Sequence, residues 1–381
     1  MKRYGLLTVT VGVFLGYTSI AGAAVRYVKP AASGTGDCAT WANACTLPSA
    51  LDGAQSGDQI WVMSGTYAPL ALKNGVKIIG GFAGWETTAS QSDPTTNLSI
   101  IDGGGTAQCV TGSDNSPSTV VRGFTIRNGR DTGDEGGGGM VLNNSSALIV
   151  QCIFENNKAG YFGGAVSVRG TGSPHFVNCI FRNNGDANGS NPLAGGAVFA
   201  SGGSSNFTNC LFHGNKAGEA GAILVRSGAP TFINCTLVNN HATITYGGAF
   251  YDQDGRIKFR NCILWGNSTT RGVGYADQGY SGSGGTTQIT YSNVQGGWVG
   301  TGNINADPLF QYPESKDYKL QSGSPCKDVG ENVALPQDVG NLDWDMDTDE
   351  MLPLDLALFN RIWNGIVDMG AYEYFEIESP E

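Results

Sequence analysis

The stretch Phe207-Thr-Asn-Cys-Leu-Phe-His-Gly-Asn215 is one of five related copies in the middle of the chain. The spacings between the cysteines of successive copies are 27, 31, 25 and 27 residues, and these cysteines are Cys152, Cys179, Cys210, Cys235 and Cys262. Five residues after each cysteine stands an asparagine, namely Asn157, Asn184, Asn215, Asn240 and Asn267. A fixed period near 25 residues is typical of solenoid proteins, in which one structural unit stacks on the next.

Outside this core of the repeat, the pattern indicates strands and tight corners. Apolar and polar residues alternate over four to six positions in each copy, as in a short β-strand. A run of small residues follows each of the first four asparagines, at Gly163-Gly-Ala165, Gly195-Gly-Ala197, Gly221-Ala222 and Gly247-Gly-Ala249. Such runs suit a corner where a side chain would clash. Because one turn of strands cannot bury its apolar face alone, the repeat predicts an all-β parallel solenoid.

Stacking places equivalent residues about 4.8 Å apart along the solenoid axis. The cysteines then form an internal ladder of small, weakly polar side chains. The asparagines form a second ladder, which hydrogen-bonds along the axis and satisfies the backbone of a corner. The alternative is a metal site on the cysteines. Stacked thiols without histidine offer no closed ligand geometry, so we expect core cysteines.

The composition agrees with a turn-rich β-protein and restricts its partners. Glycine accounts for 58 of 381 residues, about 15% against roughly 7% in ordinary globular proteins, whereas only 14% of residues are charged. The net charge of −11 disfavours binding to nucleic acid. It also disfavours attraction to anionic lipid.

The N-terminus has the pattern of a secretory signal peptide over residues 1–24. Lys2 and Arg3 precede an apolar run, and small residues suited to cleavage follow at Ala21-Gly-Ala-Ala24. No later stretch reaches 18 apolar residues, so we expect no membrane span. The protein is therefore predicted to be secreted or held at the cell surface. In an exported chain Cys38 and Cys45 are expected to form a disulfide, whereas the state of Cys109 and Cys326 stays open.

The chain also resembles known families. Its repeats, with Gly-Gly-Ala-Val and Phe-x-x-Asn, resemble those of chlamydial polymorphic outer-membrane proteins and, more broadly, right-handed parallel β-helices of the pectin-lyase-like superfamily. The tail, from Asp307-Pro-Leu-Phe310 to Asp368-Met-Gly-Ala-Tyr-Glu373, resembles the C-terminal region of choice-of-anchor Q surface proteins.

These resemblances imply a single-stranded right-handed parallel β-helix with an N-terminal cap and an Asp-rich C-terminal cap. The N-terminal cap is expected over residues 25–53 and the β-helix over 54–305. The C-terminal cap region then covers residues 306–381.

The segment between the asparagine and the glycine corner varies in length, and it is longest over residues 129–135 and 185–194. Insertions in a solenoid map to loops on one face, which is often the binding face. In the register of the repeat, the side chains of this segment would lie along a single edge of the solenoid. These residues are Asp131, Asp134, Glu135, Tyr161, Asp186, Glu219 and Tyr246. Aromatic and acidic side chains suit sugar hydroxyls, so the predicted partner is a polysaccharide or a cell-surface glycan. The alternative is a set of solvated loops.

A second candidate site is the acidic run near the C-terminus. Carboxylates at every second position can converge on Ca²⁺, and here they are Asp343, Asp345, Asp347 and Asp349. The run is not an EF-hand, because Thr348 replaces the glycine at the sixth position. Calcium is the one candidate cofactor, and an exposed acidic turn without metal is the alternative.

The function predicted from these observations is adhesion or glycan binding by an exported protein. The alternatives are a polysaccharide lyase or hydrolase acting on acidic glycans, and a structural component of an envelope or filament. Hydrolysis needs two carboxylates that face one bond, and Arg256-Ile-Lys258 supplies neither. Arg169 and Arg226 could act in a lyase, but no stacked carboxylates are evident opposite them. We therefore expect binding rather than catalysis and assign no catalytic residue; the oligomeric state stays open.

Overall fold

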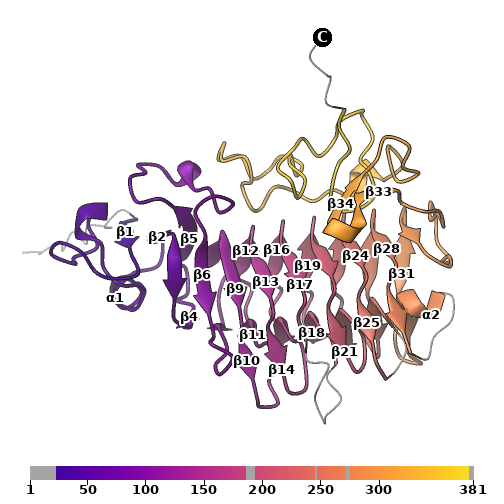
Figure 1. Ribbon diagram of the computed structural model, residues 1–381, viewed down its shortest axis with the longest axis horizontal. Coiled ribbons are helices and arrows are strands. Elements are labelled where there is room, and N and C mark those ends of the chain that lie inside the picture. The colour runs from indigo at the N-terminus through magenta and orange to yellow at the C-terminus, as the bar shows by residue number, and fades with distance from the viewer. Residues whose placement is uncertain (1–22, 186–193, 245–246, 271–274, 377–381) are drawn as a thin grey trace, which may run out of the picture.

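Three parallel sheets run along the length of the molecule, and the chain visits each in turn before it starts the next turn of the solenoid (Figure 1). The computed structural model describes residues 23–185, 194–244, 247–270 and 275–376. Within these ranges no helix is long and apolar enough to cross a membrane.

Sheet A comprises β1 (Val25–Val28), β2 (Gln59–Met63), β5 (Lys77–Phe82), β8 (Val120–Arg122), β12 (Leu148–Val150), β16 (His175–Val177), β19 (Asn206–Thr208), β23 (Thr231–Ile233), β27 (Lys258–Arg260) and β31 (Gln288–Thr290). Sheet B comprises β3 (Gly65–Tyr67), β6 (Ser99–Asp102), β9 (Phe124–Arg127), β13 (Ile153–Glu155), β17 (Ile180–Arg182), β20 (Leu211–His213), β24 (Thr236–Val238), β28 (Ile263–Trp265) and β32 (Asn293–Val294). Sheet C comprises β4 (Leu70–Ala71), β7 (Val110–Ser113), β11 (Met140–Asn143), β15 (Val166–Arg169), β18 (Val198–Ser201), β22 (Ile223–Ser227), β26 (Phe250–Asp252) and β30 (Gly279–Ser281).

Short strands mark the corner between sheets B and C. They are β10 (Arg130–Asp131) with β14 (Lys158–Ala159), and β21 (Lys216–Ala217) with β25 (His241–Ala242) and β29 (Ser268–Thr269). The antiparallel pair β33 (Phe310–Tyr312) and β34 (Asp317–Leu320) belongs to the C-terminal segment. Helices are few and short: α1 (Leu47–Gly53), α2 (Tyr275–Gln278), and the 3-10 turns η1 (Trp41–Asn43), η2 (Ala89–Gln91), η3 (Pro313–Ser315) and η4 (Asn332–Ala334).

The corner between sheets A and B consists of two residues, and its first residue explains why an amide residue precedes each repeat cysteine. That residue has a positive φ near 50° in Gln151, Asn178, Asn209, Asn234 and Asn261. Asparagine enters this left-handed region more readily than most residues with a side chain. The turn directs the next residue, the cysteine, into the interior. The predicted ladder of core cysteines is confirmed, since all five are fully buried free thiols.

The thiols are satisfied by backbone carbonyls. Cys210 Sγ, for example, lies 3.3 Å from Thr208 O and 3.5 Å from Phe176 O. Burial raises the pKa of the Cys210 thiol well above its usual value, so it is an inert core group. Cys109 and Cys326, whose state the sequence left open, are also buried free thiols.

The second ladder forms at the corner that leaves sheet B. Asn184 Nδ2 donates to Phe154 O (2.9 Å) and to Asn215 Oδ1 (3.0 Å), and its Oδ1 accepts from the N–H (3.0 Å) and Nδ2 (3.1 Å) of Asn157. The same pattern repeats in Asn215, Asn240 and Asn267. The amides therefore satisfy buried backbone that has no partner in the sheets. Stacked phenylalanines fill the interior beside them, with ring centroids 4.5 Å apart for Phe181 and Phe212.

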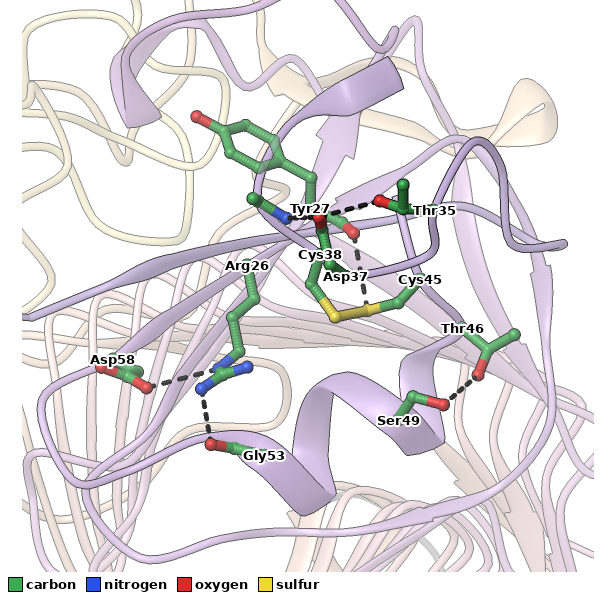
Figure 2. Close-up of a disulfide and its surroundings, with 11 residues drawn as sticks. Arg26, Tyr27, Thr35, Asp37, Cys38, Cys45, Thr46, Ser49, Gly53 and Asp58 are labelled. Atoms are coloured by element: carbon green, nitrogen blue, oxygen red, sulfur yellow. Dashed lines mark hydrogen bonds and ion pairs between the residues drawn. A yellow bond between two sulfur atoms is a disulfide. The ribbon is translucent and has the colours of Figure 1, made fainter. Parts of the chain in front are cut away.

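The N-terminal residues close one end of the solenoid. Helix α1 lies at that end and buries Leu47 and Ala50 in the core. Figure 2 shows the disulfide between Cys38 and Cys45 above this helix, which confirms the predicted bridge. The guanidinium of Arg26 joins the helix to sheet A, because it donates to Gly53 O and pairs with Asp58 at 3.4 Å.

The C-terminal segment, residues 307–376, runs back along the side of the solenoid (Figure 1). It packs against the outer faces of sheets A and B, where Leu342 and Leu352 meet Val150 and Val177, and where Tyr318 and Met369 meet Leu211 and Val238. Corner asparagines hold its backbone along the way: Asn209 Nδ2 donates to Leu354 O (2.8 Å) and Asn234 Nδ2 to Asp368 O (3.0 Å).

Candidate functional site

Sheet C carries an apolar cluster on its outer face, and all of its members belong to the solenoid: Phe162, Ala194, Phe199, Ala220, Leu224 and Tyr251. Sheets A and B have their outer apolar residues covered by the C-terminal segment. The outer face of sheet C, together with the corner that leads to it from sheet B, is therefore the candidate functional surface.

At that corner three residues flank a small pocket of about 180 Å³: Asp131, Lys158 and Tyr161. Arg130 and Thr132 add to its polar lining. The carboxylate of Asp131 is already engaged, because its Oδ2 accepts the Gly136 N–H at 2.9 Å and closes the loop that follows β10.

Arg169, at the end of β15, holds this loop in place. Its Nε donates to Glu135 O (2.9 Å) and its Nη2 to Asp134 O (2.6 Å). Ser167 Oγ donates to the same Glu135 carbonyl at 2.6 Å. The carboxylates of Asp134 and Glu135 stay exposed, so the loop contributes its backbone to the fold and its charges to the surface.

Two arginines converge on a pair of stacked phenylalanines. The rings of Phe162 and Phe199 are 4.5 Å apart and inclined by 26°. The guanidinium of Arg226 lies 4.5 Å from the centroid of Phe162, and that of Arg169 lies 4.9 Å from the centroid of Phe199. Both are cation–π distances. We call Phe162, Arg169, Phe199 and Arg226 the arginine–aromatic platform.

Arg226 lies two residues after the outward-facing Leu224, at a β-bulge of strand β22. Val225 in β22 pairs with Ala200 in β18, but the next pair is Ser227 with Ser201, so Arg226 is an extra residue. Bulges bend a strand and redirect a side chain. The bulge lies at the residue whose guanidinium contacts a phenylalanine from an earlier turn.

The platform concentrates positive charge in an acidic protein. Burial and the neighbouring Arg226 lower the pKa of Arg169, whereas Glu135, Asp131 and Asp134 counteract this shift. Two like charges held close together favour an anionic ligand between or beside them. Among the described residues neither guanidinium forms an ion pair within 4.0 Å.

Aromatic residues continue from the platform along the sheet. Leu224 pairs with Tyr251, which in turn pairs with Tyr280, so these outward side chains form one column. The two tyrosine rings are 5.6 Å apart. Partial burial, Glu219 and Tyr280 raise the pKa of Tyr251, so its phenol stays protonated at neutral pH.

The structure brings several of the predicted residues to this edge. Asp131 and Tyr161 line the corner pocket, and Glu219 lies in bridge register with Ala194, which is in register with Phe162. Asp186 and Tyr246 lie outside the described residues. Sequence reasoning overlooked Phe162 and Phe199. The sequence does contain a signal for Phe199. An aromatic residue stands there at an outward strand position, where the preceding copy has Ser167.

The acidic C-terminal run lies away from sheet C and is arranged differently from the predicted loop. The carboxylates of Asp345 and Asp347 accept N–H hydrogen bonds from the residues two positions on, at 2.7 and 2.9 Å, and Asp349 lies next in the run. Asp343 accepts the Asp345 N–H at 3.3 Å and also groups with Asp338 and Glu350, each of which offers an oxygen within 4.8 Å of the others. A second group is Asp328, Asp368 and Glu373.

Glu373 of the second group is deeply buried beside Arg361, with its carboxylate 3.6 Å from the guanidinium. Burial raises the pKa of Glu373 to about 8. Its oxygens accept the N–H groups of Trp363 (3.2 Å) and Asp368 (3.0 Å), and both oxygens of Asp368 also accept backbone N–H groups. This group therefore serves to hold the C-terminal segment together.

Comparison with known proteins gives a family and a similar fold. The family described as "Right handed beta helix region" matches residues 96–295. The crystal structure of pectate lyase Pel9A is similar, with 12% sequence identity and a TM-score of 0.47, over 93% of this chain and 97% of that chain. That likeness concerns the fold alone. None of the curated proteins matches.

Proposed function

Because the chain belongs to the right-handed β-helix family, we propose that it uses the outer face of sheet C to bind an acidic polysaccharide outside the cell. The observation that carries the proposal is the convergence of Arg169 and Arg226 on the stacked rings of Phe162 and Phe199. The ligand class that fits is a glycan with carboxylates on its sugar rings.

Each half of the platform suits one part of such a ligand. A guanidinium recognises a carboxylate through two parallel hydrogen bonds, which gives both strength and orientation. Aromatic rings offer an apolar surface to the faces of sugar rings, and here that surface comes from the half-buried Phe162 and Tyr251, whereas Phe199 is fully buried and supports Phe162. Arg169 already donates to two carbonyls, so Arg226, which is exposed, is the residue that we expect to contact the carboxylate.

Because the whole protein is negatively charged, it can recognise an acidic glycan only through local contacts. A protein of net charge −11 repels a polyanion at long range. Binding must therefore come from short-range contacts at a cationic patch, and the column from Leu224 to Tyr280 would extend the contact along the polymer.

Export and adhesion are part of the proposal. The disulfide between Cys38 and Cys45 is of the kind that persists in oxidising, extracellular compartments. The signal-peptide pattern over residues 1–24 supports the same location. The division into caps and β-helix proposed from the sequence, and the resemblances to polymorphic outer-membrane and choice-of-anchor Q proteins, stay predictions, and they favour a protein displayed at a cell surface.

A polysaccharide lyase is the competing proposal. It would need carboxylates from neighbouring turns to hold Ca²⁺ beside a basic residue. Among the described residues, the two groups of three acidic side chains close enough to share an ion both belong to the C-terminal segment. We therefore propose binding without cleavage. Unsaturated, ultraviolet-absorbing product from a uronic-acid polymer would favour the lyase instead.

We expect the mature protein to bind polygalacturonate and alginate more tightly than neutral polymers such as dextran. Arg226→Ala should weaken this binding about tenfold, because it removes one charge-assisted contact worth roughly 1.4 kcal/mol. Titration calorimetry with defined oligouronates measures the effect. Arg256→Ala is the matched control, since it removes an exposed arginine that lies outside sheet C, between β26 and β27. Equal affinities for the two variants would refute the proposed face.

A further inference from the structure

One contact between the C-terminal segment and the N-terminal half of the solenoid is made by Arg122. There the guanidinium of Arg122, on β8, donates from Nη1 to Gly340 O (3.0 Å) and Asn341 O (2.9 Å). It also lies 3.8 Å from the ring centroid of Trp344. Trp344 in turn packs with an aromatic cluster of the N-terminal turns that includes Trp61 and Phe82.

Three carboxylates meet beside this contact. Asp338 is fully buried, Glu350 is half-buried and Asp343 is exposed, and one oxygen of each lies within 4.8 Å of the other two. The group therefore has a closed, buried side and an open side from which an ion could enter.

Two of the oxygens in this group have no hydrogen-bond partner. Asp338 Oδ2 accepts the Leu342 N–H at 2.6 Å, but its Oδ1 is buried and unpartnered. Glu350 Oε1 is also buried and unpartnered. A buried carboxylate oxygen without a hydrogen-bond donor destabilises the folded protein. Because the described protein atoms leave these two oxygens without a donor, a bound cation would stabilise them.

Arg122 does not fill this role. Its hydrogen bonds go to neutral acceptors, namely Gln151 Oε1 (2.8 Å) and the carbonyls of residues 340–342. Three carboxylates beside one guanidinium leave two negative charges in excess. One divalent cation would balance them.

We propose that Asp338, Asp343 and Glu350 bind a divalent cation, and that the cation is Ca²⁺. The ligand atoms are all carboxylate oxygens, which hard cations prefer, and no histidine or cysteine belongs to the group. Calcium accepts six to eight oxygens in irregular geometry, so water can complete the shell on the open side, whereas Mg²⁺ demands a near-ideal octahedron. The bound ion fastens the acidic loop, and with it the C-terminal segment, to the flank of the solenoid.

This site differs from the ligand set that the alternating run suggests. Asp345 and Asp347 belong to the run but not to the group, and their carboxylates each accept the backbone N–H two residues on. They provide matched controls with the same charge in the same loop.

Calcium binding can be measured on the full mature protein after treatment with EDTA and dialysis. Calorimetric titration with CaCl₂ should show one site, and MgCl₂ should bind at least tenfold more weakly. A hundredfold excess of Ca²⁺ over its Kd should raise the Tm by roughly 3 °C. Glu350→Gln and Asp338→Asn should each weaken calcium binding at least tenfold, whereas Asp345→Asn should leave it unchanged.

Two results would overturn the proposal. One is the absence of any calcium-dependent heat or Tm shift in the unmodified protein. The other is an equal loss of affinity in Asp345→Asn and Glu350→Gln, which would indicate diffuse attraction to the acidic loop. Glu350→Gln keeps the test valid if Asp338→Asn does not fold. The site lies apart from sheet C, so neither result bears on glycan binding.

Discussion

Replacing Asn184 by alanine should lower the free energy of unfolding by about 4 kcal/mol. The side chain is buried, and its loss leaves three polar groups without a partner: the Phe154 carbonyl, the Asn157 N–H and one Asn157 Nδ2 hydrogen. Each buried group left unsatisfied costs ~1–3 kcal/mol. The cavity where the amide stood adds to that cost.

The neighbouring Asn183 provides the control. It is exposed and has a φ of 54°, so Asn183→Gly keeps the turn and removes only a solvated side chain. Urea denaturation followed by circular dichroism should show a much lower midpoint for Asn184→Ala and a nearly unchanged one for Asn183→Gly. If the two midpoints fall together, the buried amide of Asn184 does not stabilise the solenoid.

Replacing Arg122 by alanine is expected to cost about 3 kcal/mol and to release the C-terminal loop. Arg122 is buried and donates to Gln151 and to three backbone carbonyls, besides stacking on Trp344. Hydrogen bonds to a charged group contribute ~1.5–3 kcal/mol, and a desolvated cation–π contact about 2 kcal/mol, but these contributions are not additive. Hydrogen exchange over residues 339–350 should become faster.

Arg127→Ala serves as the comparison for Arg122→Ala. Arg127 is on the next strand of the same turn and pairs with Asp102 at 2.8 Å, with a third of its side chain exposed. Such an exposed pair is worth ~0–1 kcal/mol. Unchanged exchange in the loop after Arg122→Ala would show that the segment is held by other contacts.

The ladders explain why so much of the fold could be predicted. The cysteine represented by Cys210 recurs at one position of each turn, and the asparagine represented by Asn215 recurs at another. Because the turns stack, all five copies have the same surroundings, so the same residue types recur in the sequence. The alternation around Phe207 carries the same information about which side faces inward. A disulfide across the short interval between Cys38 and Cys45 is equally local, and it is present in the structure.

The path of the C-terminal segment could not be predicted in the same way. Arg122 meets residues about 220 positions further along the chain, and it binds them through backbone carbonyls, which every sequence possesses. The corner residues Asn209 and Asn234 show a repeat, but the repeat reflects the left-handed turn and not the tail that their side chains bind.

The candidate site was predicted by position more than by chemistry. The edge that holds Asp131, Tyr161 and Glu219 follows from the period of the repeat. The two arginines were noticed from the sequence, but their convergence on Phe162 was not, because Phe162 and Arg226 belong to different turns of the solenoid. The one-residue bulge at Arg226 is an irregularity in a single strand, which periodicity does not reveal. Likewise, Asp338 joins Asp343 and Glu350 only because the loop folds back on itself.

A crystal structure of the protein with a bound oligogalacturonate tests the central claim most directly. We expect a carboxylate of the sugar within hydrogen-bonding distance of the Arg226 guanidinium, and a sugar ring over the exposed part of Phe162 or along the column at Tyr251. A ligand bound elsewhere, with Arg226 still free in the crystal, would contradict it.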